Sequence, residues 1–349
     1  MDMVISHETA LQAVRRGAVV GAEAPCPALP EKIGVEALRR ARRALIEAGL
    51  LDHGQTMHVL LMPGQNRSRC RGVQTHRWTA DRPLPLRELG WVGQPGSEGA
   101  VHLFIVDPRL LFVEMAACLS DVSAILLGWE LCGRYGKVLP NDPRVGLRGR
   151  GFAARDPLVT RKDLELFLAS FPSGLAGARR ARRAVRFVQD RARSPMEAAV
   201  ALLLLAPARM GGFGLPAPLV NVRIPLRPRA GALTREPFFE VDLCWLERRV
   251  VVEYNGFDFH DGDPSKRAAA RDALRRNELQ QRGVRVIQLT GTDVMDPVRF
   301  ELHAQNIAQA LGWRLRLEAK GWAERFRELH AAVMGLEYVP PLDCDDAIM

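Results

Sequence analysis

The clearest alternation of apolar and polar positions lies between residues 238 and 255, where two short segments predict a β-hairpin. FFEVDLCW and VVVEYN are rich in β-branched and aromatic residues, and the charged stretch LERR joins them. Successive side chains of a strand point to opposite faces, so Asp242 faces away from its apolar neighbours. A turn centred between Glu247 and Arg248 would place Asp242 directly across from Glu253.

Two carboxylates opposite each other within apolar strands need a compensating positive charge. Like charges at directly opposite positions destabilise a sheet, and burying an unpaired carboxylate is costly. A divalent cation held by Asp242 and Glu253 would relieve both costs, and oxygen ligands suit Mg²⁺ or Mn²⁺. The alternative is an ion pair of either carboxylate with Arg248, Arg249 or another arginine. We favour the metal site, because both acids lie inside strongly apolar strands.

Helical and strand patterns surround the hairpin. SPMEAAVALLLLAPARM predicts a helix that is capped by Ser194 and has Glu197 in its first turn. VNVRIPL predicts a strand, residues 265–282 predict a helix that ends at Gly283, and VRVIQLT predicts a further strand. The order helix, three strands, helix, strand is an α/β order, and it predicts a mixed sheet flanked by helices.

The first part of the chain predicts a separate α+β module. Residues 1–52 have helical periodicity that is interrupted by prolines, and the stretch 81–99, rich in Pro and Gly, predicts a loop. VHLFIV predicts a buried strand, which is followed by an apolar helix from Pro108 to about Ala124 and a second helical piece over 126–135. MHVLLM and GVQTHRW predict a hairpin around an arginine-rich loop that contains Arg67, Arg69 and Arg71.

The length of the chain and a Gly- and Pro-rich stretch suggest several parts. With 349 residues the chain exceeds the usual size of one domain. The stretch 140–157 is the best linker candidate. We therefore expect an amino-terminal α+β module over 1–140, a linker and basic helix over 141–193, an α/β domain over 194–312, and a helical extension over 313–349.

The net charge of +9 favours a polyanionic partner such as DNA. Nearly all of the positive charge is arginine, a bias that nucleotide composition of a genome can also produce, so charge alone is modest evidence. The segment GLAGARRARRAVRFVQDRARS predicts a strongly basic helix. Arg179, Arg180 and Arg183 are its candidate nucleic-acid contacts, and a solvated helix face is the alternative.

Other compositional features favour a cytoplasmic protein. No apolar stretch approaches the ~20 residues that a helix needs to span a bilayer, so we expect no membrane partner. The six cysteines include no CxxC pair and are expected to be reduced thiols. A homodimer is left open.

The order of these residues resembles the PD-(D/E)XK nuclease superfamily. Within it, the chain is most similar to endonuclease domains related to very-short-patch repair endonuclease. The likeness covers about residues 194–296 and depends on Glu197, the segment VDLCWLERRVVVEYNGFDFH, and a later DALR followed by Gly and an apolar strand. It implies a restriction-endonuclease-like fold, DNA as the substrate, and Mg²⁺ or Mn²⁺ held by Asp242 and Glu253, with Glu197 as a third ligand. For Glu197, the alternative is a residue that only caps its helix.

The resemblance also suggests roles for residues after the hairpin. Asn255 departs from the pattern, because the superfamily often has lysine there and this branch often has aspartate. His260 would act as a general acid or base or contact phosphate, with a structural role as the alternative. Asp272 and Arg275 would contact substrate or form an i,i+3 ion pair. Gln288 would line the site or be a satisfied core amide.

Residues 1–190 more loosely resemble the module that is fused to such domains in bacteria and compared with abortive-infection antitoxins. A DNA-recognition role follows for this part by analogy. The leading hypothesis is a metal-dependent endonuclease that hydrolyses DNA phosphodiester bonds, in defence or mobile-element biology. The alternative is a DNA-binding regulator whose nuclease fold is weakened or inactive because of Asn255. A protein-interaction scaffold is a third hypothesis.

Overall fold

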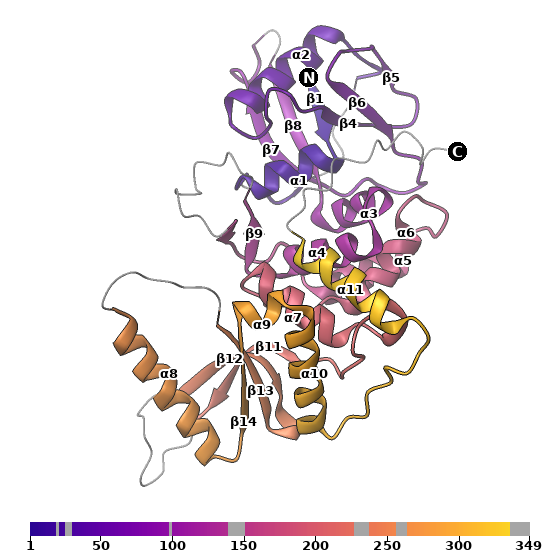
Figure 1. Ribbon diagram of the computed structural model, residues 1–349. Coiled ribbons are helices and arrows are strands. Elements are labelled where there is room, and N and C mark those ends of the chain that lie inside the picture. Colours follow the sequence, from indigo (N-terminus) through magenta and orange to yellow (C-terminus); the bar gives the residue numbers. More distant parts are fainter. Residues whose placement is uncertain are drawn as a thin grey trace. The chain divides into compact units, whose positions relative to one another are not determined.

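The computed structural model of the protein is divided into two compact units (Figure 1). The first unit contains residues 1–131 and 136–186, and the second contains residues 132–135 and 187–337. The division therefore falls next to Phe187, and the basic helix belongs to the first unit. The structure describes residues 1–18, 21–24, 30–97, 100–138, 151–226, 237–255 and 264–335, without the side chains of 67 and 264–272.

A six-stranded sheet forms the centre of the first unit, with the order β2-β7-β8-β1-β4-β6. The first strand of the chain, β1, lies in its interior, parallel to β8 and antiparallel to β4. Its residues Met3, Val4 and Ile5 are fully buried. The expectation of helix from the first residue is therefore wrong, because a short apolar run does not distinguish helix from strand. The strands are β1 (Asp2–Ile5), β2 (Glu23–Ala24), β4 (Met57–Leu61), β6 (Val73–Arg77), β7 (Leu86–Val92) and β8 (Val101–Val106).

The expected hairpin around the arginine-rich loop is wrong, because β4 and β6 run parallel. Met57 pairs with Val73 and Leu61 with Arg77. Parallel neighbours need a crossover rather than a tight turn. The connection between β4 and β6 contains β5 (Asn66–Arg67), which pairs with β3 (Lys32–Ile33). This connection brings the chain back to the edge of the sheet at which β4 begins, so that β6 can run parallel to β4.

The expected loop at 81–99 contains the strand β7, which pairs with both β2 and β8. Gly90 has φ 125° and lies at an irregularity in the pairing of β7 with β8. Here glycine permits a conformation that side chains disfavour, so it bends a strand instead of ending it.

The helices of the first unit follow the predicted pattern more closely. The two helical pieces expected after VHLFIV are α3 and α4, but they separate near Ser120 rather than after about Ala124. Cys118, at the end of α3, is disulfide-bonded, so the expectation of reduced thiols is wrong at this position. The remaining elements are α1 (His7–Arg15), α2 (Val35–Glu47), α3 (Pro108–Cys118), α4 (Asp121–Cys132), β9 (Tyr135–Lys137), β10 (Phe152–Ala154), α5 (Arg161–Ser170) and α6 (Ala178–Ala184).

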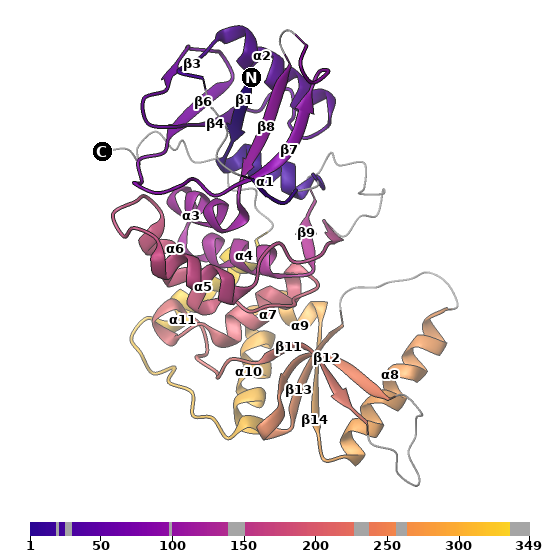
Figure 2. The same cartoon turned by 180° about the vertical axis from the view of Figure 1, so that it is seen from behind.

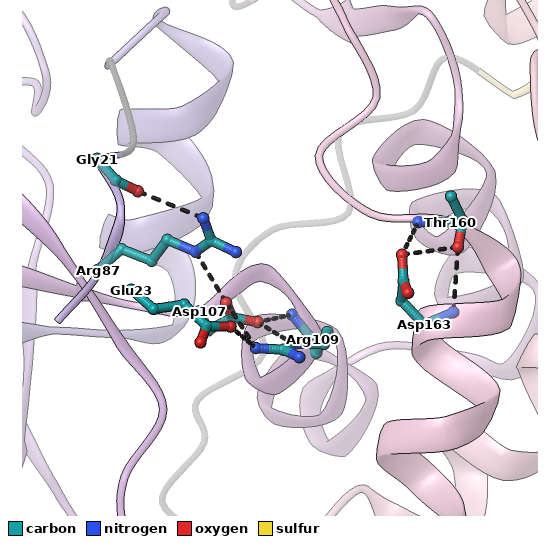
Figure 3. A network of polar contacts seen from close by, with 7 residues as sticks. All are labelled: Gly21, Glu23, Arg87, Asp107, Arg109, Thr160 and Asp163. Atoms are coloured by element: carbon teal, nitrogen blue, oxygen red, sulfur yellow. Dashed lines mark hydrogen bonds and ion pairs between the residues drawn. The ribbon is translucent and has the colours of Figure 1, made fainter. Parts of the chain in front are cut away.

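A buried carboxylate joins β8 to α3 (Figure 3). The side chain of Asp107 is fully buried and accepts hydrogen bonds from Arg87 Nε at 2.8 Å and Arg109 Nε at 2.7 Å. It also accepts the backbone N–H of Arg109 at 2.9 Å, and thereby caps the helix. Burial alone would raise the pKa of Asp107, but the hydrogen bonds from Arg109 and Arg87 hold it below its usual value. Figure 3 also shows the capping box of α5, which Thr160 and Asp163 form.

The second unit contains a four-stranded mixed sheet with the order β11-β12-β13-β14. The first three strands are antiparallel to their neighbours, and β14 is parallel to β13. Figures 1 and 2 show α8 and α10 on opposite sides of these strands, so the expected mixed sheet flanked by helices is confirmed. The elements are α7 (Pro195–Leu205), β11 (Leu219–Pro225), β12 (Phe238–Trp245), β13 (Val250–Asn255), α8 (Pro264–Gln281), β14 (Arg285–Thr290), α9 (Gly291–Met295), α10 (Pro297–Leu311) and α11 (Trp322–Met334).

Two sets of apolar contacts hold this unit together. Leu279 of α8 packs with Val251 and Cys244 of the sheet. On α10 and α11, Phe300 and Phe326 lie close to Phe213, which follows α7. The last helix is therefore an integral part of the second unit. Across the described part of the chain, no helix is both long and apolar enough to span a bilayer.

Candidate active site

The hairpin has the register that its sequence predicts. Leu243 pairs with Val252, and the same alignment holds for the two pairs nearer the turn. When this alignment is extended by one residue away from the turn, Asp242 lies opposite Glu253. A short 3-10 helix, Leu246–Arg248, forms the turn between the strands.

A row of polar residues crosses the apolar sheet at this level. The register of β11 with β12 places Asn221 opposite Asp242, and β13 pairs Glu253 with Gln288 of β14. Each strand therefore contributes one polar residue to the row. Asn221 is only 5% exposed and has φ 46°, a left-handed conformation that asparagine tolerates better than most residues. The polar row is the candidate site.

Asp242 has the most perturbed carboxyl group of the polar row. Its Oδ2 accepts a hydrogen bond from the backbone N–H of Tyr254 at 2.8 Å. Burial, the charge of Glu197 and the charge of Glu253 raise the pKa of Asp242 to about 7, against the opposing effects of the Tyr254 hydrogen bond and Arg275. A carboxyl group with this pKa is partly protonated at neutral pH. The perturbation marks a place where positive charge is lacking.

Glu197 reaches the polar row from the start of α7. Its Oε2 accepts hydrogen bonds from Asn221 Nδ2 at 2.5 Å and the backbone N–H of Arg193 at 2.9 Å. Its Oε1 accepts the hydroxyl of Ser194, the N-cap residue, at 2.9 Å. The two interpretations of Glu197 are therefore compatible, because it closes the start of the helix and its charge also acts on Asp242.

Two arginines from α8 lie against the other end of the polar row. Arg275 Nη2 is 2.8 Å from Glu253 Oε1, so the arginine alternative holds for Glu253 but with a partner from the helix. Glu253 Oε1 is buried and makes no aligned hydrogen bond in the described structure. Arg276 Nη1 donates to Gln288 Oε1 at 2.8 Å, which makes Gln288 a satisfied amide beside the site.

The side-chain oxygens of the polar row are of the kind that a hard divalent cation prefers, but their present arrangement is not that of a metal site. Asp242 and Glu253 offer carboxylate oxygens, which Mg²⁺ and Mn²⁺ prefer. Among the described residues, however, no group of three or more His, Cys, Asp or Glu is arranged to hold a metal ion. A cation between Asp242 and Glu253 would take over the position that the Arg275 guanidinium now occupies beside Glu253.

Three other predicted site residues contribute less to the site. Asn255 is exposed at the end of β13, in register with Thr290. His260 and the side chain of Asp272 lie outside the described residues. Sequence reasoning missed Asn221 and Arg276. Asn221 could have been found, because it is a polar residue within the apolar strand VNVRIP. Nothing in the sequence distinguishes Arg276 from the other arginines of its helix.

The candidate nucleic-acid contacts of the first unit divide into two sets. Arg180 donates to the carbonyls of Ala116 and Ala117 at the end of α3, and both Arg180 and Arg183 pair with Asp121. Cations and N–H donors at this position satisfy the last carbonyls of a helix, so Arg180 has a structural role. The second set consists of arginines whose side chains are exposed to solvent, namely Arg69, Arg71 and Arg179. The side chain of Arg67 lies outside the described structure.

Comparison with known proteins gives little information about activity. No protein-family model matches the chain, and no solved structure matches it. Uncharacterized proteins from two strains of Mycobacterium tuberculosis are each 28% identical to it over 149 residues, which is 43% of this chain and 47% of the relative. The chain thus spans about half the length of the curated relatives that it matches.

Proposed function

We propose that the second unit is a metal-dependent endonuclease that hydrolyses DNA phosphodiester bonds and has a PD-(D/E)XK-type, restriction-endonuclease-like core. The observation that carries this proposal is the meeting of Asp242 and Glu253 in register on the two central strands, with Glu197 close to Asp242. The element order α7, β11, β12, β13, α8, β14 supports it, since the resemblance implies that order.

Within this proposal, Asp242 and Glu253 hold Mg²⁺ or Mn²⁺, and Glu197 binds it directly or through water. The metal would supply positive charge to the attacked phosphate and an acidified water. Asp242 has to lose its proton before it can ligate, so metal binding should strengthen as pH rises through about 7. Asn221 holds Glu197 in place through its hydrogen bond. Arg275 would leave Glu253 when the metal binds and would instead pair with a phosphate oxygen of the DNA, which suits a guanidinium.

A second candidate function is DNA binding without cleavage. Two observations favour it: Arg275 already neutralises Glu253, and Asn255 carries no charge with which to orient a nucleophile. The chain would then be a regulator with an inactive nuclease core, in which the polar row is structural. A role in defence or mobile-element biology is proposed for either function by analogy with the fusions of such domains.

The decisive experiment is a cleavage assay on the full chain. Supercoiled plasmid and single-stranded DNA are incubated with the protein and Mg²⁺, Mn²⁺ or a chelator, alongside Asp242→Ala. Glu247→Ala is the matched control, because it removes an exposed carboxylate from the same hairpin. We expect metal-dependent cleavage by the wild type and Glu247→Ala, and none by Asp242→Ala. Binding of DNA without cleavage under all conditions would favour the regulator, and an increase of activity in Asn255→Lys would identify position 255 as the cause.

A further inference from the structure

A groove lined by arginines lies in the first unit, where α6 packs beside α3 (Figures 1 and 2). Its volume of about 720 Å³ is within the ~300–1,000 Å³ that is typical of ligand sites. The lining consists of Ala116 and Ala117 at the end of α3, the segment 173–177, and Arg179, Arg180 and Arg183 of α6. We call this feature the α3–α6 groove, and all of its lining belongs to the first unit.

The segment 173–177 lies directly on α3, because its last residue is a glycine. Gly177 has φ 79°, and a Cβ atom at this position would be 2.0 Å from the carbonyl oxygen of Val113. Any side chain at position 177 would therefore push the segment away from α3. Ser173 and Ala176, which also line the groove, are small as well, so an extended ligand can approach this surface closely.

The arginines give the α3–α6 groove a net positive charge. Arg180 is held in place, because its Nη1 donates to the carbonyl of Leu119 at 2.7 Å and its Nε donates to Asp121 Oδ1 at 2.9 Å. Arg179 and Arg183 are exposed and lie four residues apart, so they are on the same side of α6. Asp121 offsets part of the charge, and none of the described lining residues is acidic. The ligand that matches this groove is therefore an anion.

The shape and composition of the groove favour the backbone of duplex DNA over its bases. Base edges lie at the bottom of the DNA grooves, so a protein recognises them with an element that protrudes, usually a helix or a β-ribbon. A concave surface instead receives the convex sugar–phosphate backbone. Single strands are usually bound by stacking of their bases on aromatic side chains, and no described residue of the lining is aromatic.

We propose that the α3–α6 groove binds the sugar–phosphate backbone of duplex DNA without recognising its sequence. Arg179 and Arg183 contact phosphates of one strand, since guanidinium groups suit phosphate oxygens, and the fixed charge of Arg180 adds to the attraction. The first unit then contributes affinity rather than sequence recognition. This inference rests on the proposed function only for the identity of the polyanion, DNA.

Fluorescence anisotropy on the full chain tests this proposal. The probes are two labelled duplex oligonucleotides of equal length and unrelated sequence, titrated at several salt concentrations in the presence of a chelator. Binding measured in this way does not need catalysis, so its failure is distinguishable from failure of the proposed nuclease, which the plasmid assay measures. We expect both duplexes to bind and both Kd values to rise steeply with salt, because bound phosphates release counterions.

A pair of arginine substitutions separates the groove from the overall charge of the protein. Replacing Arg179 and Arg183 together by alanine should raise Kd about tenfold, by the same factor for both duplexes, and should reduce the salt slope by about 2, since each phosphate contact contributes roughly 0.9. The matched control replaces Arg39 and Arg43 of α2 by alanine. These arginines are also exposed and four residues apart, but they lie outside the lining, so Kd should change less than about twofold.

A second test adds negative charge to the groove and leaves every arginine in place. Ala176 is an exposed residue of the lining, so Ala176→Glu should bind DNA about fivefold more weakly than the neutral Ala176→Gln, because a carboxylate repels phosphates. Circular dichroism should show the same fold for every variant. Absence of binding by the wild type, an equal loss of affinity in the groove and control pairs, or equal binding by Ala176→Glu and Ala176→Gln would overturn the proposal.

Discussion

The raised pKa of Asp242 makes the stability of the second unit depend on pH in a way that one substitution should remove. In the unfolded chain the carboxyl group has an ordinary pKa near 3.8, and in the folded chain it is about 7. The folded state therefore binds the proton more tightly. This contribution to stability is fully present below about pH 3.8 and is lost as pH rises through about 7. Asp242→Asn keeps the shape and can still accept the N–H of Tyr254, but it does not titrate.

The magnitude follows from the size of the shift. About three pKa units at ~1.36 kcal/mol each correspond to roughly 4 kcal/mol over the whole range. Between about pH 5 and pH 8 the wild type should lose about 2 to 3 kcal/mol of this contribution, whereas Asp242→Asn should lose none. Relative to the wild type, the variant should therefore gain that amount of stability across this interval.

Urea unfolding at several pH values, followed by tryptophan fluorescence, measures this difference. Glu247→Gln is the control, because it neutralises an exposed carboxylate of the same hairpin. Its stability should run parallel to that of the wild type. If the difference between Asp242→Asn and the wild type stayed constant from pH 5 to pH 8, the argument that burial and neighbouring carboxylates perturb Asp242 would be refuted.

The other predictions concern the same row and the helix cap of the first unit. Mg²⁺ or Mn²⁺ should raise the Tm of the wild type more at pH 8 than at pH 6, and should have no such effect on Asp242→Ala in differential scanning fluorimetry. Asn221→Ala should reduce cleavage at least fivefold while DNA binding measured by gel shift stays unchanged, because Glu197 loses the donor that orients it. Asp107→Ala should destabilise the protein by about 3–5 kcal/mol in urea, because two arginines lose a buried partner and α3 loses its cap. A loss below about 1 kcal/mol would contradict that account.

Local sequence signals were sufficient for the hairpin and for the helices with clear caps. The register of Asp242 with Glu253 follows from the symmetry of one short turn, and the start of α7 follows from Ser194. Both are set by contacts between residues close in sequence. The mixed sheet could be anticipated for the same reason, because the order of helices and strands is itself local information.

Features that depend on distant contacts were not predictable. The parallel pairing of β4 with β6 depends on the pairing of β3 with β5, which joins residues that lie far apart in the chain. The α3–α6 groove combines residues 116 and 117 with residues 173–183, and no spacing rule connects them. The proximity of Arg275 to Glu253 depends on how α8 packs on the sheet, which alternation of apolar residues does not specify.

The interior position of β1 has a consequence for the synthesis of the protein. This strand leaves the ribosome well before its parallel neighbour β8, which lies at residues 101–106. At ~5–20 residues per second, the apolar residues of β1 wait on the order of 5 to 20 seconds for that partner. During this interval they depend on transient contacts or on chaperones for protection. Slow translation between β4 and β8 should therefore increase aggregation of the nascent first unit, whereas slow translation after β8 should not.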